Sequence, residues 1–203
     1  MIVVSAPSGA GKTTILSRVL RELPGIRFSV SHTTRPPREL EKDGVDYHFV
    51  DEAEFARLEQ QEAFLESASV YGHHYGTCRR EYERAQQDGV DLLLDLDVQG
   101  ASQVRAKLPD AVSIFILPPS YQDLEQRLRG RAQDGEEAIR RRLREAGQEL
   151  GHYGAYDYAL VNDDLDHSVE ELKSVIRAAR ARVSRRADEA REILKTFESN
   201  KER

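Results

Sequence analysis

The sequence has few of the features that mark secreted, membrane-bound or nucleic-acid-binding chains. Its 203 residues include a single cysteine, Cys78, which excludes an intrachain disulfide framework. No apolar run approaches the roughly 20 residues that span a bilayer, and a short strand pattern stands where a secretory signal would begin. The formal net charge of −6 disfavours general nucleic-acid binding, which needs basic patches. We therefore expect a cytoplasmic protein with no membrane or nucleic-acid partner.

A glycine-rich stretch, residues 5–14, reads SAPSGAGKTT and predicts a phosphate-binding loop, or P-loop. It connects the apolar, β-branched residues 2–4 to apolar residues at helical spacing over 15–23. The N–H groups of such a loop and the helix N-terminus point at an anion. Lys12 can reach the β- and γ-phosphates of a nucleotide, and the Thr13 hydroxyl can ligate Mg²⁺. The residues expected to bind ATP here are Ser8, Gly9, Ala10, Gly11, Lys12, Thr13 and Thr14.

One position of the P-loop departs from the usual G-x-x-x-x-G-K-[ST] pattern, because Ala6 replaces the first glycine. Alanine resists a positive φ, so we expect residue 6 to keep an ordinary backbone conformation. The alternative interpretation is a tight turn with a chance lysine, and the flanking strand and helix patterns argue against it.

Strand and helix patterns alternate along the rest of the chain, with no internal repeat. Strands are predicted at 26–31, 91–97, 112–117 and 156–163, and helices at 79–88, 98–108, 121–130, 136–150 and from 165 onward with a break near Ser184. Such alternation predicts a parallel sheet with helices on both faces. Ligands bind such sheets at the carboxyl ends of the strands. The P-loop, Ser31, Asp95 and Asn162 all fall at that edge.

Residues 32–75 interrupt the alternation and predict a small mixed β insert, with strands at 45–50, 64–70 and 73–76. Arg35 and Arg38 stand on a segment stiffened by two prolines, and two guanidinium groups there suit a phosphate. A solvated surface loop is the commoner interpretation of such a pair. His73 and His74 would point to opposite faces of a strand, so we do not expect them to bind a metal.

Charged residues flank the predicted carboxyl edge. Asp95 ends a buried strand beside the P-loop, where a Mg²⁺-binding carboxylate sits in related sites, although strand-end aspartates are also common in turns. The segment 128–145 joins two arginine-rich helix ends by a polar loop, which is typical of a lid that closes on a transferring phosphate. A solvated helix with Glu–Arg pairs is the alternative, and we assign Arg129, Arg140, Arg141 and Arg144 to it. The C-terminal arginines, at positions 177, 180, 182, 185 and 186, are interpreted as a solvated face.

Jointly, several stretches resemble guanylate kinases of the bacterial type over essentially the whole chain. They are SAPSGAGK (5–12), VSHTTR (30–35), DYHF (46–49), FLE (64–66), YGT (75–77), LDLDVQG (94–100), IFILPP (114–119) and VNDD (161–164). The resemblance implies an α/β fold: a three-layer P-loop kinase core with a parallel sheet (1–31, 76–127 and 146–203), a GMP-binding insert (32–75) and a helical lid (128–145).

The resemblance also implies the activity and the roles of residues. The activity is transfer of the ATP γ-phosphoryl group to GMP or dGMP, with Mg²⁺ near Thr13 and Asp95. Arg35, Arg38, Tyr47 and Tyr75 would hold the GMP phosphate, and Ser31, Glu66 and Thr77 would read guanine, with Asp97 nearby. Lys12, Arg35, Arg127, Arg131 and Arg142 would be the catalytic cations. Arg131 would otherwise lie over adenine, whose site Asn162 would line.

Two departures and two alternatives accompany the resemblance. Thr77 stands where some relatives have serine and keeps the hydroxyl, whereas Ser67 replaces a histidine or tryptophan often found after the glutamate. A non-catalytic guanylate-kinase-like binding module would lack an intact P-loop and the phosphate-gripping arginines. A ribose-bisphosphate phosphokinase on the same core would lack the guanine-reading set. This sequence retains all of these features.

Overall fold

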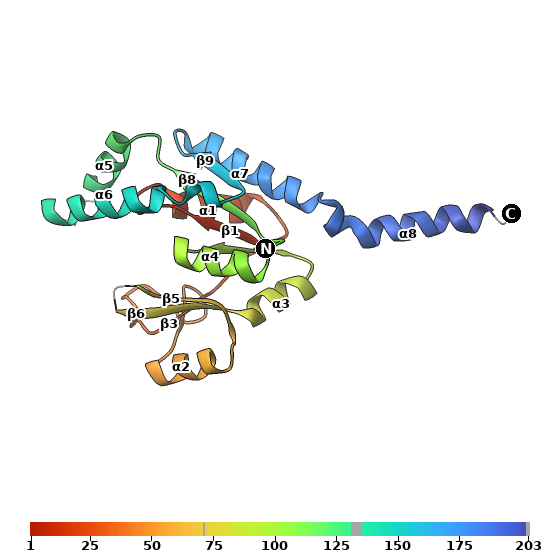
Figure 1. Ribbon diagram of the computed structural model, residues 1–203, viewed down its shortest axis with the longest axis horizontal. Coiled ribbons are helices and arrows are strands. Elements are labelled where there is room, and N and C mark those ends of the chain that lie inside the picture. Colours follow the sequence, from red (N-terminus) through yellow and green to blue (C-terminus); the bar gives the residue numbers. More distant parts are fainter. Residues whose placement is uncertain (71, 131–134, 202–203) are drawn as a thin grey trace.

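The computed structural model describes residues 1–70, 72–130 and 135–201 (Figure 1). Its strands are β1 (Ile2–Ser5), β2 (Ile26–Phe28), β3 (His32–Thr33), β4 (His48–Phe49), β5 (Phe64–Val70), β6 (His73–Cys78), β7 (Asp91–Asp95), β8 (Val112–Leu117) and β9 (Tyr158–Val161). Its helices are α1 (Lys12–Glu22), α2 (Glu52–Gln60), α3 (Arg79–Gln87), α4 (Val98–Lys107), α5 (Tyr121–Arg129), α6 (Glu136–Leu150), α7 (Leu165–Arg180) and α8 (Val183–Lys201), with a 3₁₀ turn, η1 (Tyr153–Ala155).

The main sheet is parallel and has the strand order β2-β7-β1-β8-β9. All four residues of β1 are buried, because a parallel strand covered on both faces has no solvated side. The alternation of strands and helices therefore predicted the sheet correctly. The predicted boundaries of two strands were wrong: β7 ends at Asp95 instead of residue 97, and β9 spans four residues within the predicted 156–163.

Helices cover both faces of the main sheet. Successive side chains of β1 point to opposite faces, so Val4 packs with Ile15 of α1 and Leu172 of α7, whereas Val3 packs with Val104 of α4. Helix α3 joins the Val3 side through Ala85. These two apolar layers make the predicted three-layer core. No helix in the described part of the chain is both long and apolar enough to cross a membrane.

The insert forms a second, mixed sheet with the order β4-β3-β6-β5 around a small core of Phe55, Phe64 and Cys78. The predicted strand at 45–50 was too long. Its first part is a turn, in which the side chain of Asp46 accepts from the backbone of Lys42 over 2.8 Å. Such side-chain hydrogen bonds compete with strand pairing.

The predicted strand at 26–31 was also too long, because the chain changes sheets within it. The N–H of Ser29 still donates to Leu93 of β7 over 2.9 Å. Two residues later, the carbonyl oxygen of Ser31 accepts from the N–H of His48, the first residue of β4. Figure 1 shows the result: the second sheet lies below the main sheet, with α4 between them. This arrangement sets the insert against the carboxyl-edge loops of the core.

The C-terminal helices are separated at Ala181 and Arg182, slightly before the predicted break at Ser184. Helix α8 extends away from the body (Figure 1).

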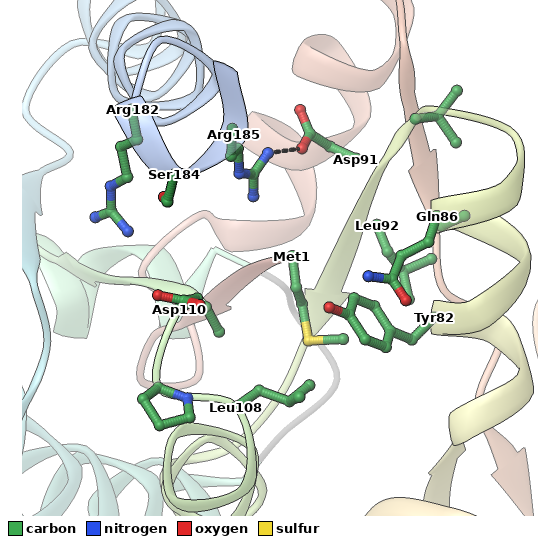
Figure 2. A pocket seen from close by; sticks show the side chains of 14 residues that line it. Met1, Tyr82, Gln86, Asp91, Leu92, Leu108, Asp110, Arg182, Ser184 and Arg185 are labelled. Atoms are coloured by element: carbon green, nitrogen blue, oxygen red, sulfur yellow. Dashed lines mark hydrogen bonds and ion pairs between the residues drawn. The ribbon is translucent and has the colours of Figure 1, made fainter. Parts of the chain in front are cut away.

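The prediction that the C-terminal arginines are only a solvated face is wrong for Arg180 and Arg185. Both guanidinium groups pair with Asp91, the 7% exposed first residue of β7. Burial alone would raise the pKa of Asp91, but hydrogen bonds from the two arginines outweigh it and hold that pKa below its usual value. Figure 2 shows the Asp91–Arg185 pair at the rim of a cavity of about 300 Å³, which lies at the edge of the main sheet opposite the P-loop.

Candidate functional site

The loop between β1 and α1 has the conformation of a phosphate cradle. Gly9 and Gly11 have φ angles of 92° and 95°, a region that favours glycine. Gly11 is the N-cap of α1, so the helix N-terminus opens at Lys12. Glu62 is the one non-glycine residue with positive φ in the described chain, which confirms the ordinary conformation expected for Ala6. The loop lines a cavity of about 410 Å³.

Lys12 and Asp95 meet beside this cavity. Their side chains form an ion pair in which Lys12 is 19% and Asp95 28% exposed. The Lys12 Nζ also lies 3.5 Å from the carbonyl oxygen of Leu96. Thr13 and Thr14 are exposed and line the cavity. The carboxyl ends of β1 and β7, which are neighbours in the sheet, thus bring a cation, a carboxylate and hydroxyls to one place.

Asn162 and Arg127 lie against the back of the P-loop. The Asn162 amide donates to the Ala10 carbonyl oxygen over 2.7 Å and accepts from the Ser168 hydroxyl at 3.2 Å. Arg127 donates to the carbonyl oxygens of Asn162 (2.8 Å) and Ala10 (3.3 Å). A methyl group on Gly11 would come within 2.3 Å of the Asn162 Nδ2. These two side chains therefore hold the loop in shape.

A buried carboxylate stands on the other side of the site. Glu66 of β5 is 3% exposed, and a β-bulge between Phe64 and Glu66 lets Leu65 and Glu66 both point inward. Burial raises the pKa of Glu66, and hydrogen bonds from Thr77 oppose that rise only in part. The Thr77 hydroxyl lies 3.2 Å from the hydroxyl of Ser31. A carboxylate and two hydroxyls thus offer acceptors and donors suited to the edge of a base.

Arg35, Tyr47 and Tyr75 form a second cluster on the insert. The Arg35 guanidinium lies 5.5 Å from the centre of the Tyr47 ring, and the two tyrosine rings are 5.9 Å apart. One nitrogen of Arg35 donates to both carboxylate oxygens of Glu41, over 2.8 and 2.9 Å. Glu41 also accepts from the backbone N–H of Arg38, whose side chain is exposed. The Glu41 carboxylate thus occupies the position beside Arg35 at which a phosphate would bind.

Helix α6 carries charged side chains to the P-loop cavity. Arg142 is half-buried and lines the cavity, whereas Arg144 is exposed. Glu145 and Glu149 line the same cavity. Burial raises the pKa of Glu149, and the charge of Lys12 opposes that rise. Cations and carboxylates of α6 thus both face the phosphate cradle.

The other arginines of the predicted lid have separate positions. Arg129 pairs with glutamates of α5 and α6, and Arg141 lies 3.7 Å from Glu145. Arg140 is exposed. Arg131 lies outside the described residues.

The last predicted site residues are Asp97 and the two expected Mg²⁺ ligands, Thr13 and Asp95. Asp97 lines the P-loop cavity and caps α4, because its carboxylate accepts from the N–H of Gly100 over 2.7 Å. In the described ranges, no group of three or more histidine, cysteine or acidic side chains is placed to hold a metal ion. Mg²⁺ in phosphoryl-transfer sites takes one or two protein ligands and completes its shell with phosphates and water. The Thr13 hydroxyl and the Asp95 carboxylate, beside the phosphate cradle, fit that chemistry.

Three functional features were absent from the sequence predictions. Glu41 holds Arg35, Glu145 and Glu149 enter the P-loop cavity, and Gln103 of α4 bonds to the backbone of Ser67. The helical spacing of 142, 145 and 149 could have indicated the second feature, because it places all three on one face.

Comparisons with known proteins agree on one family. The family model described as guanylate kinase matches residues 1–179. A guanylate kinase of Alkalilimnicola ehrlichii is 48% identical over 195 residues, covering 96% of each chain. One from Escherichia coli K12 is 50% identical over 187 residues, covering 91% of this chain and 90% of that protein. The crystal structure of guanylate kinase from Anaplasma phagocytophilum matches with a TM-score of 0.74 and 36% identity, covering 91% of this chain and 88% of the other.

Proposed function

The chain belongs to the guanylate kinase family and is an ATP:GMP phosphotransferase, and we propose that the insert binds GMP while the P-loop side binds ATP. The observation that supports GMP binding at the insert is the carboxylate of Glu66. It is only 3% exposed, and no basic side chain forms an ion pair with it in the described structure. The relatives do not favour a ribose-bisphosphate phosphokinase or a non-catalytic module.

Guanine is read by the buried carboxylate of Glu66. An ionised carboxylate accepts hydrogen bonds only, so it can take both the N1–H and the 2-amino group of guanine. The hydroxyls of Ser31 and Thr77 donate to O6, and Asp97 stands nearby. The GMP phosphate is held by Arg35, Arg38, Tyr47 and Tyr75. When that phosphate binds, it replaces Glu41 as the partner of the Arg35 guanidinium, which is supported by their present hydrogen bonds.

Phosphoryl transfer requires positioning and charge neutralisation more than covalent chemistry. The P-loop backbone from Ser8 to Thr14 cradles the ATP phosphates, and Lys12 exchanges Asp95 for phosphate oxygens. Arg35, Arg127, Arg131 and Arg142 neutralise charge around the transferring group. A phosphate oxygen of GMP is already an anionic nucleophile, so we assign no general base. Thr13 and Asp95 would hold Mg²⁺, which would further neutralise the charge of the phosphates.

We divide the chain into a core (1–31, 76–127 and 146–203), a GMP-binding insert (32–75) and a lid (128–145). Closure of the lid would bring Arg142 onto the transferring phosphate, and Arg131 either joins it or lies over adenine. Asn162 borders the adenine site while its amide braces the P-loop. dGMP is accepted as well, since no role assigned here depends on the 2′-hydroxyl. The enzyme acts in the cytoplasm, where Cys78, its single cysteine, stays reduced.

A coupled assay of ADP release tests this proposal, with ATP against GMP, dGMP, AMP, CMP and UMP and with Mg²⁺ added or chelated. We expect turnover with GMP and dGMP, far slower turnover with the other three, and loss of activity on chelation. Preference for AMP or for a pyrimidine nucleotide would overturn the assignment of Glu66 as the guanine reader.

A further inference from the structure

One face of α4 holds the backbone of β5 around Glu66. The Nε2 of Gln103 donates to the carbonyl oxygen of Ser67 over 2.7 Å, and its Oε1 accepts from the Ser67 N–H at 3.1 Å. Lys107, one turn further on, donates to the carbonyl oxygen of Phe64 at 3.3 Å. Helix α4 therefore binds the strand on both sides of Glu66.

These contacts provide hydrogen-bond partners for backbone groups of β5 that the second sheet leaves unpaired. Strand β5 is at the edge of the second sheet, so one side of its backbone has no neighbouring strand. The β-bulge between Phe64 and Glu66 also interrupts its pairing with β6. The side-chain amide of Gln103 presents a donor and an acceptor together, and it satisfies both backbone groups of Ser67.

Gly100, one turn before Gln103, makes room for the carboxylate itself. A methyl group built on Gly100 would stand 2.7 Å from Oε2 of Glu66 and 3.3 Å from its Cδ. Gly100 does not have a positive φ, so its backbone would accept alanine and only space requires glycine. An added methyl would move the carboxylate by at least about 0.7 Å to restore ordinary contact.

We infer that Gly100 and Gln103 are positioning residues that set guanine specificity by fixing where the Glu66 carboxylate stands. The inference rests on the proposed function of Glu66. Two hydrogen bonds to guanine require both carboxylate oxygens in place, and displacements near 1 Å cost up to about 10²-fold in rate. ATP binds on the P-loop side, which neither residue lines, so the effect should be confined to the acceptor nucleotide.

The experiment compares Gly100→Ala and Gln103→Met with the wild type. We measure kcat and KM for GMP, AMP and ATP, together with the melting temperature. We expect Gly100→Ala to raise the KM for GMP about tenfold or more and to lower the GMP/AMP ratio of kcat/KM. Gln103→Met should act in the same direction by several-fold, with the KM for ATP within about twofold of the wild type. The control Gly147→Ala adds the same methyl at an exposed position of α6, where nothing lies within 4 Å. It should leave kcat and the KM values for GMP, AMP and ATP unchanged.

A double variant separates positioning from general damage. In the Glu66→Asp background the shorter side chain leaves room for the methyl, so Gly100→Ala should cost less there than in the wild type. Equal costs in the two backgrounds, or a parallel rise in the KM values for ATP and GMP, would overturn the inference. Glu66→Gln runs in the same assay: if it leaves GMP kinetics unchanged, the proposed function of Glu66 fails instead. If Gly100→Ala does not fold, Gln103→Met decides by the same criteria.

Discussion

Replacement of Glu66 by glutamine is the most direct test of how the enzyme selects guanine. Glutamine keeps the shape of the side chain but offers one acceptor and one amino donor. One guanine donor would then face the amide NH₂ of glutamine, at a position that is only 3% exposed. Loss of a charged hydrogen bond costs about 1.5–3 kcal/mol, and leaving a buried donor unpaired adds about 1–3 kcal/mol. Together these predict a fall in kcat/KM for GMP of about 10²-fold or more.

Adenine should respond in the opposite sense. The N1 of adenine is an acceptor and would face the lone pairs of the ionised Glu66, whereas the side-chain amide NH₂ of glutamine can donate to it. The GMP/AMP ratio of kcat/KM should therefore fall further than activity on GMP alone. The assay is coupled ADP release with both nucleotides, and Glu83→Gln, an exposed site on α3, is the matched control. An unchanged GMP/AMP ratio in Glu66→Gln would refute the reasoning.

The pH profile gives an independent check on the same residue. Burial raises the pKa of Glu66, so protonation begins at a higher pH than for an exposed glutamate. Since the protonated form loses an acceptor, kcat/KM for GMP should fall as pH drops through this raised pKa. The GMP phosphate also titrates, at about pH 6. Glu66→Gln supplies the reference, because it removes the titration of Glu66 and retains that of the substrate and of the other groups in the site. Superimposable normalised profiles for wild type and variant would contradict the assigned role.

Other variants test the remaining parts of the molecule. Lys12→Ala should abolish turnover while leaving the melting temperature nearly unchanged, and near wild-type kcat would refute the P-loop assignment. Arg142→Ala should lower kcat much more than it raises the KM for GMP, whereas replacement of the exposed Arg144 by alanine should leave both nearly unchanged. Equal effects of the two variants would mean that Arg142 acts only through its contribution to net charge. Asp91→Asn should lower the free energy of unfolding by about 2–3 kcal/mol at pH 7 without changing kinetics. Because the folded pKa of Asp91 is depressed, this difference should be full above the unfolded pKa and disappear as pH falls through the folded one, as denaturant titrations would show.

The main sheet could be predicted because its signals are local. Residues 2–4 and 112–117 are continuous apolar runs, and each is bounded by turn residues, so pattern and fold agree. The end of β2 could not be predicted in this way. The apolar alternation continues through 26–31, but the hydrogen-bond partner changes from Leu93 to His48. A strand pattern reports which residues can be extended and does not report which neighbour they pair with.

The same distinction separates the site residues that the sequence indicated from those it did not. Lys12 and Glu66 stand in short motifs, because a group that contacts substrate needs a fixed local setting. Their supports come from elsewhere in the chain. Gln103, which the sequence did not indicate, is 36 residues from Ser67. Asn162 was expected only at the adenine site, and its hydrogen bond to Ala10, 152 residues away, was not predicted. Only tertiary packing brings such pairs together. Since about 1 Å at the reacting groups decides rate, we expect base specificity to depend also on side chains that do not contact the nucleotide. Gln103→Met should therefore change base choice while every motif residue stays in place.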